Sequence, residues 1–417
     1  MKPLDIVILG LTVTSSWGNG HATTYRSLIR GLAARGHRVL FLERDAPWYA
    51  GNRDEPNPPG ATIAIYQSFE ELVARFEREV EQASLVIVGS YVPDGVRCGE
   101  WVTSVALGKT AFYDIDTPIT LAKLGAGEEE YITPNLIRRY DAYFSFTGGP
   151  ALRHIENHYG SPMARALYCS VDLERYCPFA MDMQWDLGYL GTYSLDRQPA
   201  LTRLLIEPAR QWTDGRFAIV GPQYPDDMEW PVNVERTIHL SPREHPAFYG
   251  GQRFTLNITR EAMKRAGYSP SVRLFEAGAC AVPVISDWWE GLDSVFRIGQ
   301  ELLVAEGADD VLRILHDLPE AQRLRIATSA RARVLAEHTP EQRASQLEGY
   351  LKEMDDDFSL SAARRNRRHR KVSCGIESGL PSEPEREVAS AAACAHAIPV
   401  YSQRGLHKPS GARSGNR

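Results

Sequence analysis

Short and almost uninterrupted apolar runs recur along the chain, with helical segments between them. In roughly the first 170 residues, these runs are LDIVILG, HRVLFLE, SLVIVGS, TAFYDID and DAYFSF. A strand that is covered on both faces is apolar on both faces, as in parallel sheets wrapped by helices. The first part of the chain therefore predicts a doubly wound α/β domain with a parallel sheet.

A second series of the same kind follows, with helices expected at about 196–212 and around Glu276. It consists of WDLGYLGTY, RFAIVG, RTIHLS, RFTLNIT, AVPVIS and ELLVAEG. Between the two series, CSVDLERYCPFAMDMQW has few periodic positions and contains Pro178, which predicts a linker. The simplest architecture has two Rossmann-like domains, 1–177 and 178–355, which face a central cleft and bind ligands near the carboxyl ends of their strands.

The chain changes character after about Asp357. The remaining sequence is rich in Ser, Gly, Pro and Arg and shows no sustained periodicity. We therefore expect residues 356–417 to form a disordered, basic, low-complexity tail. The run from Arg364 to Lys371 has the charge to contact an anionic lipid, RNA or an acidic protein, but a solvated tail without a specific partner is the favoured interpretation.

Composition argues against several classes of protein. The net charge is −6, so no global basic field points to nucleic acid. None of the six cysteines forms a CxxC pair, and their spacings match no zinc site. The first apolar run is interrupted by Asp5, lacks the cleavage site of a signal peptide, and no run approaches the ~20 apolar residues of a membrane span. We expect a cytoplasmic protein without metal or cofactor, whose basic tail is the part suited to a membrane surface.

The stretch SPSVRLFEAGACAVPVISDWWEG contains a carboxylate, Glu276, at a position where burial is energetically unfavourable. As a helix that starts at Ser271, it puts Val272, Phe275 and Ala279 on one apolar stripe, and Glu276 falls within that stripe. A buried, unpaired carboxylate costs several kcal/mol, so Glu276 needs a partner or faces a cavity.

The start of the same helix suits an anion. Ser269 is a good N-cap, Pro270 fits the first helical position, and Ser271 and Val272 follow with free backbone N–H groups. Such a helix start binds phosphates. A diphosphate there would bring a ribose near Glu276, and carboxylates commonly accept hydrogen bonds from ribose hydroxyls.

These residues resemble the donor-binding segment of GT-B glycosyltransferases, particularly family 4 and the related spore-maturation (CgeB-like) group. The match to the second half of the family-4 motif consists of Glu276, Ala277, Ala279, Pro283, Val284 and Ile285. ALYCSVDLERYCP is similar to the segment that ends the N-terminal domain of these enzymes, and GNGHATTYRSLIRGLAARGHRVLFLE to their first loop, helix and second strand. The resemblance covers roughly residues 4–350. It implies a GT-B fold, metal-independent transfer of a sugar from a nucleotide-diphosphate donor, and binding of the donor ribose by Glu276.

One position departs from the family-4 motif. Its first Glu, which lies near the transferred sugar, would stand eight residues before Glu276, and that residue is Tyr268. The departure leaves open the contacts to the donor sugar and the retaining outcome that family 4 implies. It also leaves open a GT-B-like binding or scaffold protein without catalytic activity.

Other residues of the second domain are candidates for binding the donor phosphates. Arg260 ends a strand where ligands approach, and Arg273 lies on the same helix as Glu276. Each arginine could instead pair with a surface carboxylate. Gly191 and Thr192 follow the first strand of this domain, where a backbone contact to phosphate and a simple tight turn are equally compatible with the sequence.

The loop after the first strand contains Gly18, Asn19 and Gly20. It fails as a GxGxxG dinucleotide fingerprint because Thr23 stands at the third glycine and the loop begins far from the strand end. As a GT-B first loop it would approach the acceptor and the transferred sugar. An NAD-dependent enzyme remains an alternative, because Glu43 ends the second strand where an NAD ribose carboxylate would be.

Two residues are candidates for proton transfer from the acceptor. The ordinary pKa of histidine suits a general base, so His21 is a candidate, although a helix-capping or core role fits at least as well. The stretch YDIDTP contains Asp114 and Asp116. Two aspartates at this spacing bind metal in GT-A glycosyltransferases, but the pattern is short and common by chance. We favour the alternative that Asp116 faces the acceptor side of the cleft. Thr147 and Gly148, in another strand-end turn, would line the acceptor side of the cleft or form a plain turn.

The leading hypothesis is a glycosyltransferase. Its expected partners are a nucleotide sugar and an acceptor that is a carbohydrate, a lipid-linked molecule or a small molecule.

Overall fold

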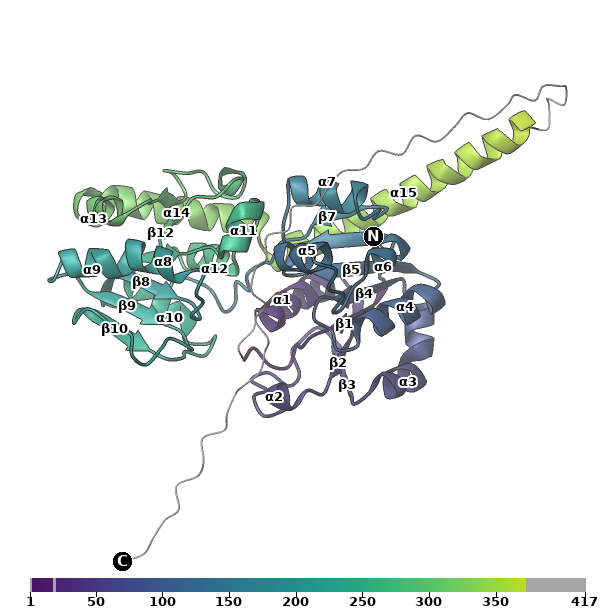
Figure 1. Ribbon diagram of the computed structural model, residues 1–417, viewed down its shortest axis with the longest axis horizontal. Helices are drawn as coiled ribbons and strands as arrows, with labels where there is room; N and C mark the ends of the chain where they lie inside the picture. The colour runs from purple at the N-terminus through teal and green to yellow at the C-terminus, as the bar shows by residue number, and fades with distance from the viewer. Residues whose placement is uncertain (1, 18–19, 373–417) are drawn as a thin grey trace, which may run out of the picture. The chain divides into compact units, whose positions relative to one another are not determined.

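The computed structural model describes residues 2–17 and 20–372. Two sheets follow each other along this part of the chain, and helices flank both of them (Figure 1). The strand orders are β3-β2-β1-β4-β5-β6-β7 and β10-β9-β8-β11-β12-β13, and the neighbouring strands pair in parallel. The prediction of two doubly wound α/β halves is confirmed.

The N-terminal half alternates strands with helices, as the apolar runs predict. Its strands are β1 (Asp5–Gly10), β2 (Arg38–Arg44), β3 (Thr62–Tyr66), β4 (Leu85–Gly89), β5 (Lys109–Asp114), β6 (Ala142–Ser145) and β7 (Ala164–Ala166). Its helices are α1 (His21–Ala34), α2 (Pro47–Ala50), α3 (Phe69–Gln82), α4 (Gly95–Val105), α5 (Thr117–Gly125), α6 (Pro134–Arg139) and α7 (Pro150–Asn157).

The C-terminal half repeats this alternation. Its strands are β8 (Trp185–Leu190), β9 (Phe217–Val220), β10 (Val234–Thr237), β11 (Gln252–Asn257), β12 (Val284–Ser286) and β13 (Leu303–Val304). Its helical segments are α8 (Gln198–Leu201), the π-helical η1 (Thr202–Ile206), α9 (Glu207–Gln211), α10 (His245–Gly250), α11 (Glu261–Ala266), α12 (Val272–Ala279), the 3₁₀ turn η2 (Leu292–Ser294), α13 (Ala308–Asp317) and α14 (Glu320–Glu337). The last helix is α15 (Pro340–Val372).

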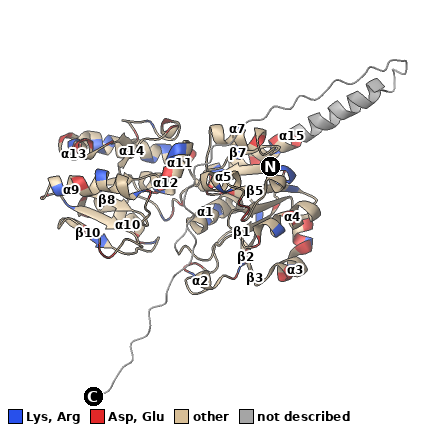
Figure 2. Ribbon diagram, viewed as in Figure 1, with Lys and Arg blue, Asp and Glu red and all other residues tan. Residues whose placement is uncertain are grey.

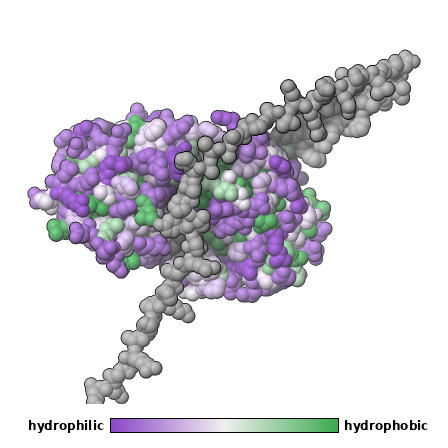
Figure 3. Space-filling view, viewed as in Figure 1, coloured by the Kyte–Doolittle hydropathy of each residue, from purple (hydrophilic) through white to green (hydrophobic). Residues whose placement is uncertain are grey.

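The strands contribute side chains to two cores, one on either face of the sheet. In β1, Val7 and Leu9 belong to one buried cluster, while Ile6 and Ile8 belong to the other. Successive side chains of a strand point to opposite faces, so an uninterrupted apolar run is what a sheet with two covered faces requires. The surface in Figure 3 is mostly hydrophilic, with hydrophobic residues in small groups.

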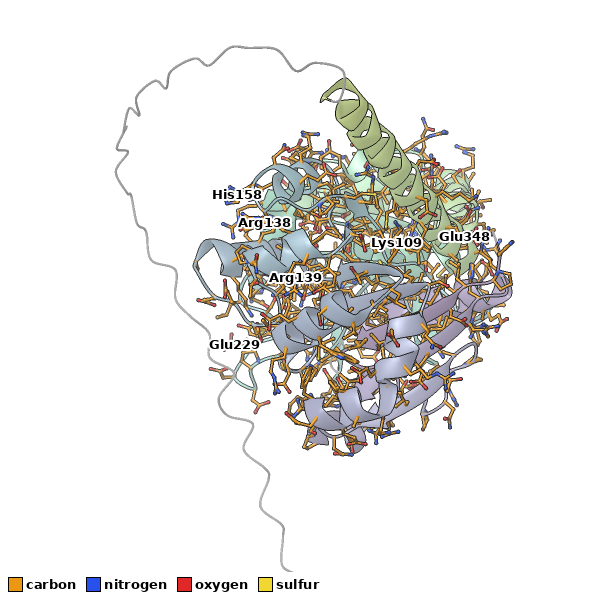
Figure 4. All side chains as sticks on the ribbon, turned by 90° about the vertical axis from the view of Figure 1, so that its right-hand side faces the viewer. Lys109, Arg138, Arg139, His158, Glu229 and Glu348 are labelled. Carbon is orange, nitrogen blue, oxygen red and sulfur yellow. The ribbon has the colours of Figure 1, made fainter. Side chains whose placement is uncertain are left out.

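The helix α15 corrects the predicted domain boundary at residue 355. Its residues Ala344, Leu347 and Leu351 are buried in the same cluster as Ile6 and Ile8 of the first sheet. Glu348, labelled in Figure 4, accepts hydrogen bonds from Arg35 and His37 of the N-terminal half. The end of the chain's second half therefore completes the core of the first, which local sequence patterns could not reveal.

The start of the predicted tail also differs from expectation. The helix α15 continues to Val372, beyond Asp357, where we expected disorder. Ala and Arg are good helix formers, and no Pro or Gly stands between Gly349 and Gly375, so nothing in this stretch ends the helix. Residues 373–417 lie outside the described part of the chain. The backbone of the basic run Arg364–Lys371 belongs to α15, its side chains lie outside the described part of the structure, and a partner of this run stays a prediction.

The predicted linker has no regular secondary structure, as expected, but it is packed into the protein. Residues 167–184 contain neither a helix nor a strand. Nevertheless Val171 and Tyr176 are buried in one cluster with Leu274 and Phe275 of α12. This segment therefore helps to fix α12. Among the described residues, none of the helices combines the length and apolar character that a membrane span requires.

Candidate functional site

Asn257 connects the elements that meet at the carboxyl edge of the second sheet. It ends β11 and is fully buried. Its side-chain oxygen accepts hydrogen bonds from Ser271 Oγ at 2.7 Å and from Arg273 Nη1 at 2.8 Å. Its amide donates to Ser286 Oγ of β12 at 2.9 Å. Asn257 was not among the residues predicted from the sequence. The signal that could have indicated it is a polar residue at the end of the apolar run RFTLN.

The helix α12 starts two residues later than predicted. Ser271 is its N-cap, and Val272 is its first helical residue. Ser269 and Pro270 precede it in extended chain, because the Ser269 hydroxyl contacts Thr147 Oγ1 instead of capping the helix. The Ser271 hydroxyl does not cap it either, since it donates to Asn257. The first N–H groups of a helix have no intrahelical acceptor, so those of Val272 and Arg273 suit an anion.

Arg273 reaches back from α12 to the turn after β8. Its Nε donates to the Leu190 carbonyl at 2.7 Å, and its guanidinium lies 4.9 Å from the ring centre of Tyr189. A Cβ at Gly191 would stand 2.5 Å from the Tyr189 hydroxyl and 3.0 Å from Arg273 Nη2, so glycine makes room for both side chains there. The structure thus brings Arg273 next to Gly191 and shows that the arginine is buried and hydrogen-bonded; binding of phosphate by these residues and Thr192 stays a prediction.

The partner of Glu276 is a tyrosine. Glu276 is only 5% exposed, and Tyr249 of α10 donates a hydrogen bond to its Oε2 at 3.1 Å. Burial and the Glu276 charge raise the pKa values of both Tyr249 and Tyr176 well above the usual value, so both hydroxyls stay protonated donors. Tyr176 also contacts His245 Nδ1 at 3.1 Å. The sequence required a partner or a cavity for Glu276, and the structure supplies the partner.

Basic side chains stand beside this edge of the sheet. Arg260 is the N-cap of α11 and is 43% exposed, with its Nε 4.0 Å from Asp196. One turn further, Lys264 Nζ lies 3.8 Å from the buried Asp287. Figure 2 shows basic residues in blue and acidic residues in red on both halves of the molecule. Lys264 and Asp287 were not singled out in the sequence, because only the fold places them beside Arg260.

Asp287 fixes the loop that carries Arg260. It follows β12 and accepts hydrogen bonds from the backbone N–H of Thr259 at 3.2 Å and from its hydroxyl at 2.9 Å. Burial raises the pKa of Asp287, an effect that these hydrogen bonds and Lys264 oppose.

His21 and Asp116, the two candidates for proton transfer, lie on either side of Tyr91. The His21 and Tyr91 rings meet edge to face, with centres 5.6 Å apart. Tyr91 donates a hydrogen bond to Asp116 Oδ2 at 3.3 Å. Burial lowers the pKa of His21 to about 4, so the imidazole is neutral at pH 7. Burial raises the pKa of Asp116, and the positive charge of Arg260 partly opposes this.

Asp114 has a structural role rather than a catalytic one. It is fully buried and accepts hydrogen bonds from the hydroxyls of Tyr143 and Thr120 and from the Asp116 backbone. Burial raises its pKa to about 6. Within the described residues, no group of three or more His, Cys, Asp or Glu side chains is arranged to hold a metal ion.

Glu43 is not available to a ribose, which removes the residue on which the NAD alternative depended. It is fully buried, and its carboxylate accepts hydrogen bonds from the Val13 N–H at 2.6 Å, the Thr14 N–H at 3.0 Å and the Thr14 hydroxyl at 2.6 Å. Glu43 therefore fixes the chain after β1. Of the glycine-containing loop, Gly18 and Asn19 lie outside the described residues, and Gly20 is the exposed N-cap of α1.

Thr147 and Gly148, which we expected to line the acceptor side of the cleft or to form a plain turn, contact the C-terminal half. Thr147 is fully buried, and its hydroxyl is 2.8 Å from Ser269 Oγ. The Gly148 N–H donates to the Tyr268 carbonyl at 2.9 Å. The two residues therefore form part of the contact between the halves, and their role towards an acceptor stays a prediction.

Comparison with solved structures identifies the fold as GT-B, the two-domain fold of many glycosyltransferases. Sucrose-phosphate synthase (tll1590) from Thermosynechococcus elongatus aligns with a TM-score of 0.60 at 15% identity, covering 84% of this chain and 99% of that one. Anabaena Alr3699/HepE in complex with UDP and glucose aligns with a TM-score of 0.62 at 13% identity, covering 84% and 100%. AviGT4, a glycosyltransferase involved in avilamycin A biosynthesis, aligns with a TM-score of 0.58 at 14% identity, covering 84% and 98%.

A family model described as glycosyl transferase-like matches residues 197–349. This range contains Asn257, Arg260, Arg273 and Glu276, so the sequence similarity falls on the described site. A comparison of the sequence with curated proteins found no significant match.

Proposed function

We propose that the protein is a glycosyltransferase that moves a sugar from a nucleotide-diphosphate donor to an acceptor hydroxyl. The observation that carries this proposal is the arrangement around Asn257, which ties the start of α12 and Arg273 to the turn after β8. A helix start, a fixed guanidinium and a glycine turn at the carboxyl ends of parallel strands are suited to a diphosphate. The match of the glycosyl transferase-like family model to the same region supports the assignment.

In this proposal the second half binds the donor. The diphosphate lies at the start of α12, against the N–H groups of Val272 and Arg273. Arg260 and Lys264 neutralise its charge from α11. Glu276, one turn into α12, binds the ribose hydroxyls, while Tyr249 holds its carboxylate in place. A carboxylate has about four acceptor positions, so one or two tyrosine donors leave room for a ribose.

The first half supplies the acceptor side. A bond forms between the acceptor oxygen and the anomeric carbon, the bond from that carbon to the donor phosphate breaks, and the acceptor proton passes to a base. Asp116 is the stronger candidate, because burial raises its pKa and makes it a better base than an ordinary carboxylate. His21 accepts protons weakly at a pKa of about 4, and we assign it to orienting Tyr91.

Stabilisation of the departing diphosphate is the largest catalytic effect we expect. The helix start and Arg273 are fixed by hydrogen bonds before the donor arrives, and Arg260 lies 4.0 Å from Asp196. Preorganised donors of this kind are more effective than water because they need little reorganisation during reaction. We further propose that the reaction needs no metal ion, and that the protein acts in the cytoplasm, with peripheral contact to membranes through its basic tail.

Titration calorimetry with UDP, GDP, ADP, dTDP and NAD tests the donor site. The HepE structures are complexes with UDP or UDP-glucose, so UDP is the first nucleotide to test. We expect saturable binding of one nucleoside diphosphate, followed by its release from the matching nucleotide sugar. Binding of NAD alone would contradict the proposal. Binding of a nucleoside diphosphate without sugar transfer to any acceptor would favour the scaffold alternative.

A further inference from the structure

Tyr268 has an unusual backbone conformation. Its φ is +47°, in the left-handed region that non-glycine residues seldom adopt. Both of its backbone polar groups are bonded: the N–H donates to the Glu290 carbonyl at 2.6 Å, and the carbonyl accepts from the Gly148 N–H at 2.9 Å. The first bond stays within the C-terminal half, whereas the second joins it to the N-terminal half. Surrounding structure must hold such a conformation, which makes it informative about function.

The Tyr268 ring lies between two glycines, one from each half. A Cβ at Gly149 would stand 2.4 Å from Cδ2 of the ring, and a Cβ at Gly291 would stand 2.3 Å from Cδ1. Both glycines also have positive φ, at +58° and +86°. No other residue fits at either position without moving the ring, so the two glycines form a slot for Tyr268.

Neighbouring residues extend this contact. The hydroxyls of Thr147 and Ser269 are 2.8 Å apart, and both residues are buried. We call the set Thr147, Gly148, Gly149, Tyr268, Ser269 and Gly291 the Tyr268 clasp. In the N-terminal half the clasp begins at Thr147, two residues after the end of β6, and in the C-terminal half Ser269 stands two residues before the Ser271 N-cap of α12. It therefore joins the N-terminal half to the element that begins the proposed diphosphate site.

We propose that Tyr268 is a positioning residue that holds the acceptor half in register with the start of α12. This inference rests on the proposed function, because it assigns the clasp to alignment of acceptor and donor. Separation of the halves requires the ring to leave its slot and breaks the bonds of Gly148 and Thr147. The left-handed backbone of Tyr268 then relaxes. The clasp is thus a two-state contact of the kind that domain closure uses.

Two substitutions separate the ring from the backbone. Tyr268→Gly removes the ring but adopts a positive φ freely, and Gly149→Ala places a methyl group in the slot. We expect both variants to show a larger radius of gyration by small-angle X-ray scattering, with unchanged affinity for UDP by calorimetry. Sugar transfer should fall roughly 10²-fold at saturating donor, since small misplacements of reacting groups have effects of that size. Tyr268→Phe should behave like the wild type, as should the control Trp48→Ala, which alters an exposed aromatic residue elsewhere.

The outcomes distinguish the clasp from the proposed function. Wild-type scattering from both Tyr268→Gly and Gly149→Ala would overturn the clasp. An expanded Tyr268→Gly variant with tenfold weaker UDP binding would also overturn it, because the tyrosine would then shape the donor site itself. If the wild-type protein binds no nucleoside diphosphate, the proposed function fails, and the scattering comparison still decides whether Tyr268 holds the halves together.

Discussion

Glu276 and Glu43 are both buried carboxylates, yet their surroundings differ. Glu43 accepts two backbone N–H groups and a hydroxyl at 3.0 Å or less, which uses most of its capacity inside the protein. Glu276 is held by the Tyr249 hydroxyl, with Tyr176 near its charge. A carboxylate has about four acceptor positions, so the three donors at Glu43 leave little capacity, whereas the tyrosine donor at Glu276 leaves positions for a ligand. This difference motivates two predictions.

Replacement of Glu276 by Gln should weaken nucleotide binding with little loss of stability. Two hydrogen bonds from ribose to an ionised group contribute roughly 2–4 kcal/mol, so Kd should rise by about 30-fold to several hundredfold. Calorimetry with the nucleoside diphosphate that binds the wild type measures the effect, and a thermal melt checks the fold. Tyr249→Phe is the matched control, which removes the protein partner but keeps the carboxylate. Equal affinity of a folded Glu276→Gln variant and the wild type would refute the ribose assignment.

Replacement of Glu43 by Gln should lower the stability of the protein and leave nucleotide binding unchanged. The glutamine amide lacks the negative charge that accepts hydrogen bonds from Val13 and Thr14. Its NH₂ group is itself a donor and would meet one of these donors. We expect a loss of about 2–3 kcal/mol in the free energy of unfolding, measured by urea denaturation. Nucleotide affinity should not change, because Glu43 fixes the chain after β1 in the other half. A variant as stable as the wild type would show that these short hydrogen bonds contribute little.

The lowered pKa of His21 predicts how the stability of the protein depends on pH. Its pKa is about 4 in the folded protein and 6.5 as the reference value, so between these limits the unfolded chain binds the extra proton. The stability that neutral His21 provides is fully present above pH 6.5 and is lost as pH falls towards 4, about 3 kcal/mol in all. Urea denaturation at pH 7 and pH 4.5 should show a smaller loss for His21→Gln than for the wild type. The same loss in both proteins would mean that other groups govern the acid sensitivity.

Most strands could be predicted from the sequence because each is buried on both faces and therefore forms a continuous apolar run. β10 shows the limit of that reasoning: the predicted run RTIHLS extends beyond Thr237, where the strand ends, and Ile238 is 73% exposed. The site was partly predictable. Glu276 and the start of α12 carry local signals, whereas Asn257, Tyr91 and Lys264 acquire their roles only through contacts between distant segments.

Among the elements, α15 depends most on tertiary contacts. Its apolar residues Ala344, Leu347, Leu351 and Met354 recur at helical spacing, but the strands that share their buried cluster all belong to the N-terminal half. Leu347→Ala should lower the free energy of unfolding by about 2–5 kcal/mol, because it leaves a cavity in the first core. The exposed Lys352→Ala should change it by less than about 0.5 kcal/mol. Urea denaturation measures both, and similar values would show that α15 does not complete this core.

At the scale of the whole molecule, the two halves are not independent folding units. The chain leaves the N-terminal half at the segment 167–184, builds the second sheet, and returns through α15 to the first core. The buried Tyr176 in this segment packs against α12, and α15 completes the first core. The proposed donor half is therefore connected to the acceptor half at both of its ends. Such connections limit the relative motion of the halves to rotation about these segments.

A fragment of residues 1–177 should therefore fail to fold on its own, although the sequence suggests a domain boundary there. Without α15, the first sheet exposes the apolar groove that Leu347 and Leu351 fill, and exposed apolar surface of this kind favours aggregation. A chain that ends after Asp357 retains these contacts, so it should melt at the same temperature as the full-length protein. Circular dichroism melts of the two truncated chains test the pair of expectations. A cooperative transition of the 1–177 fragment at the full-length temperature would show that α15 only covers a core that is already complete.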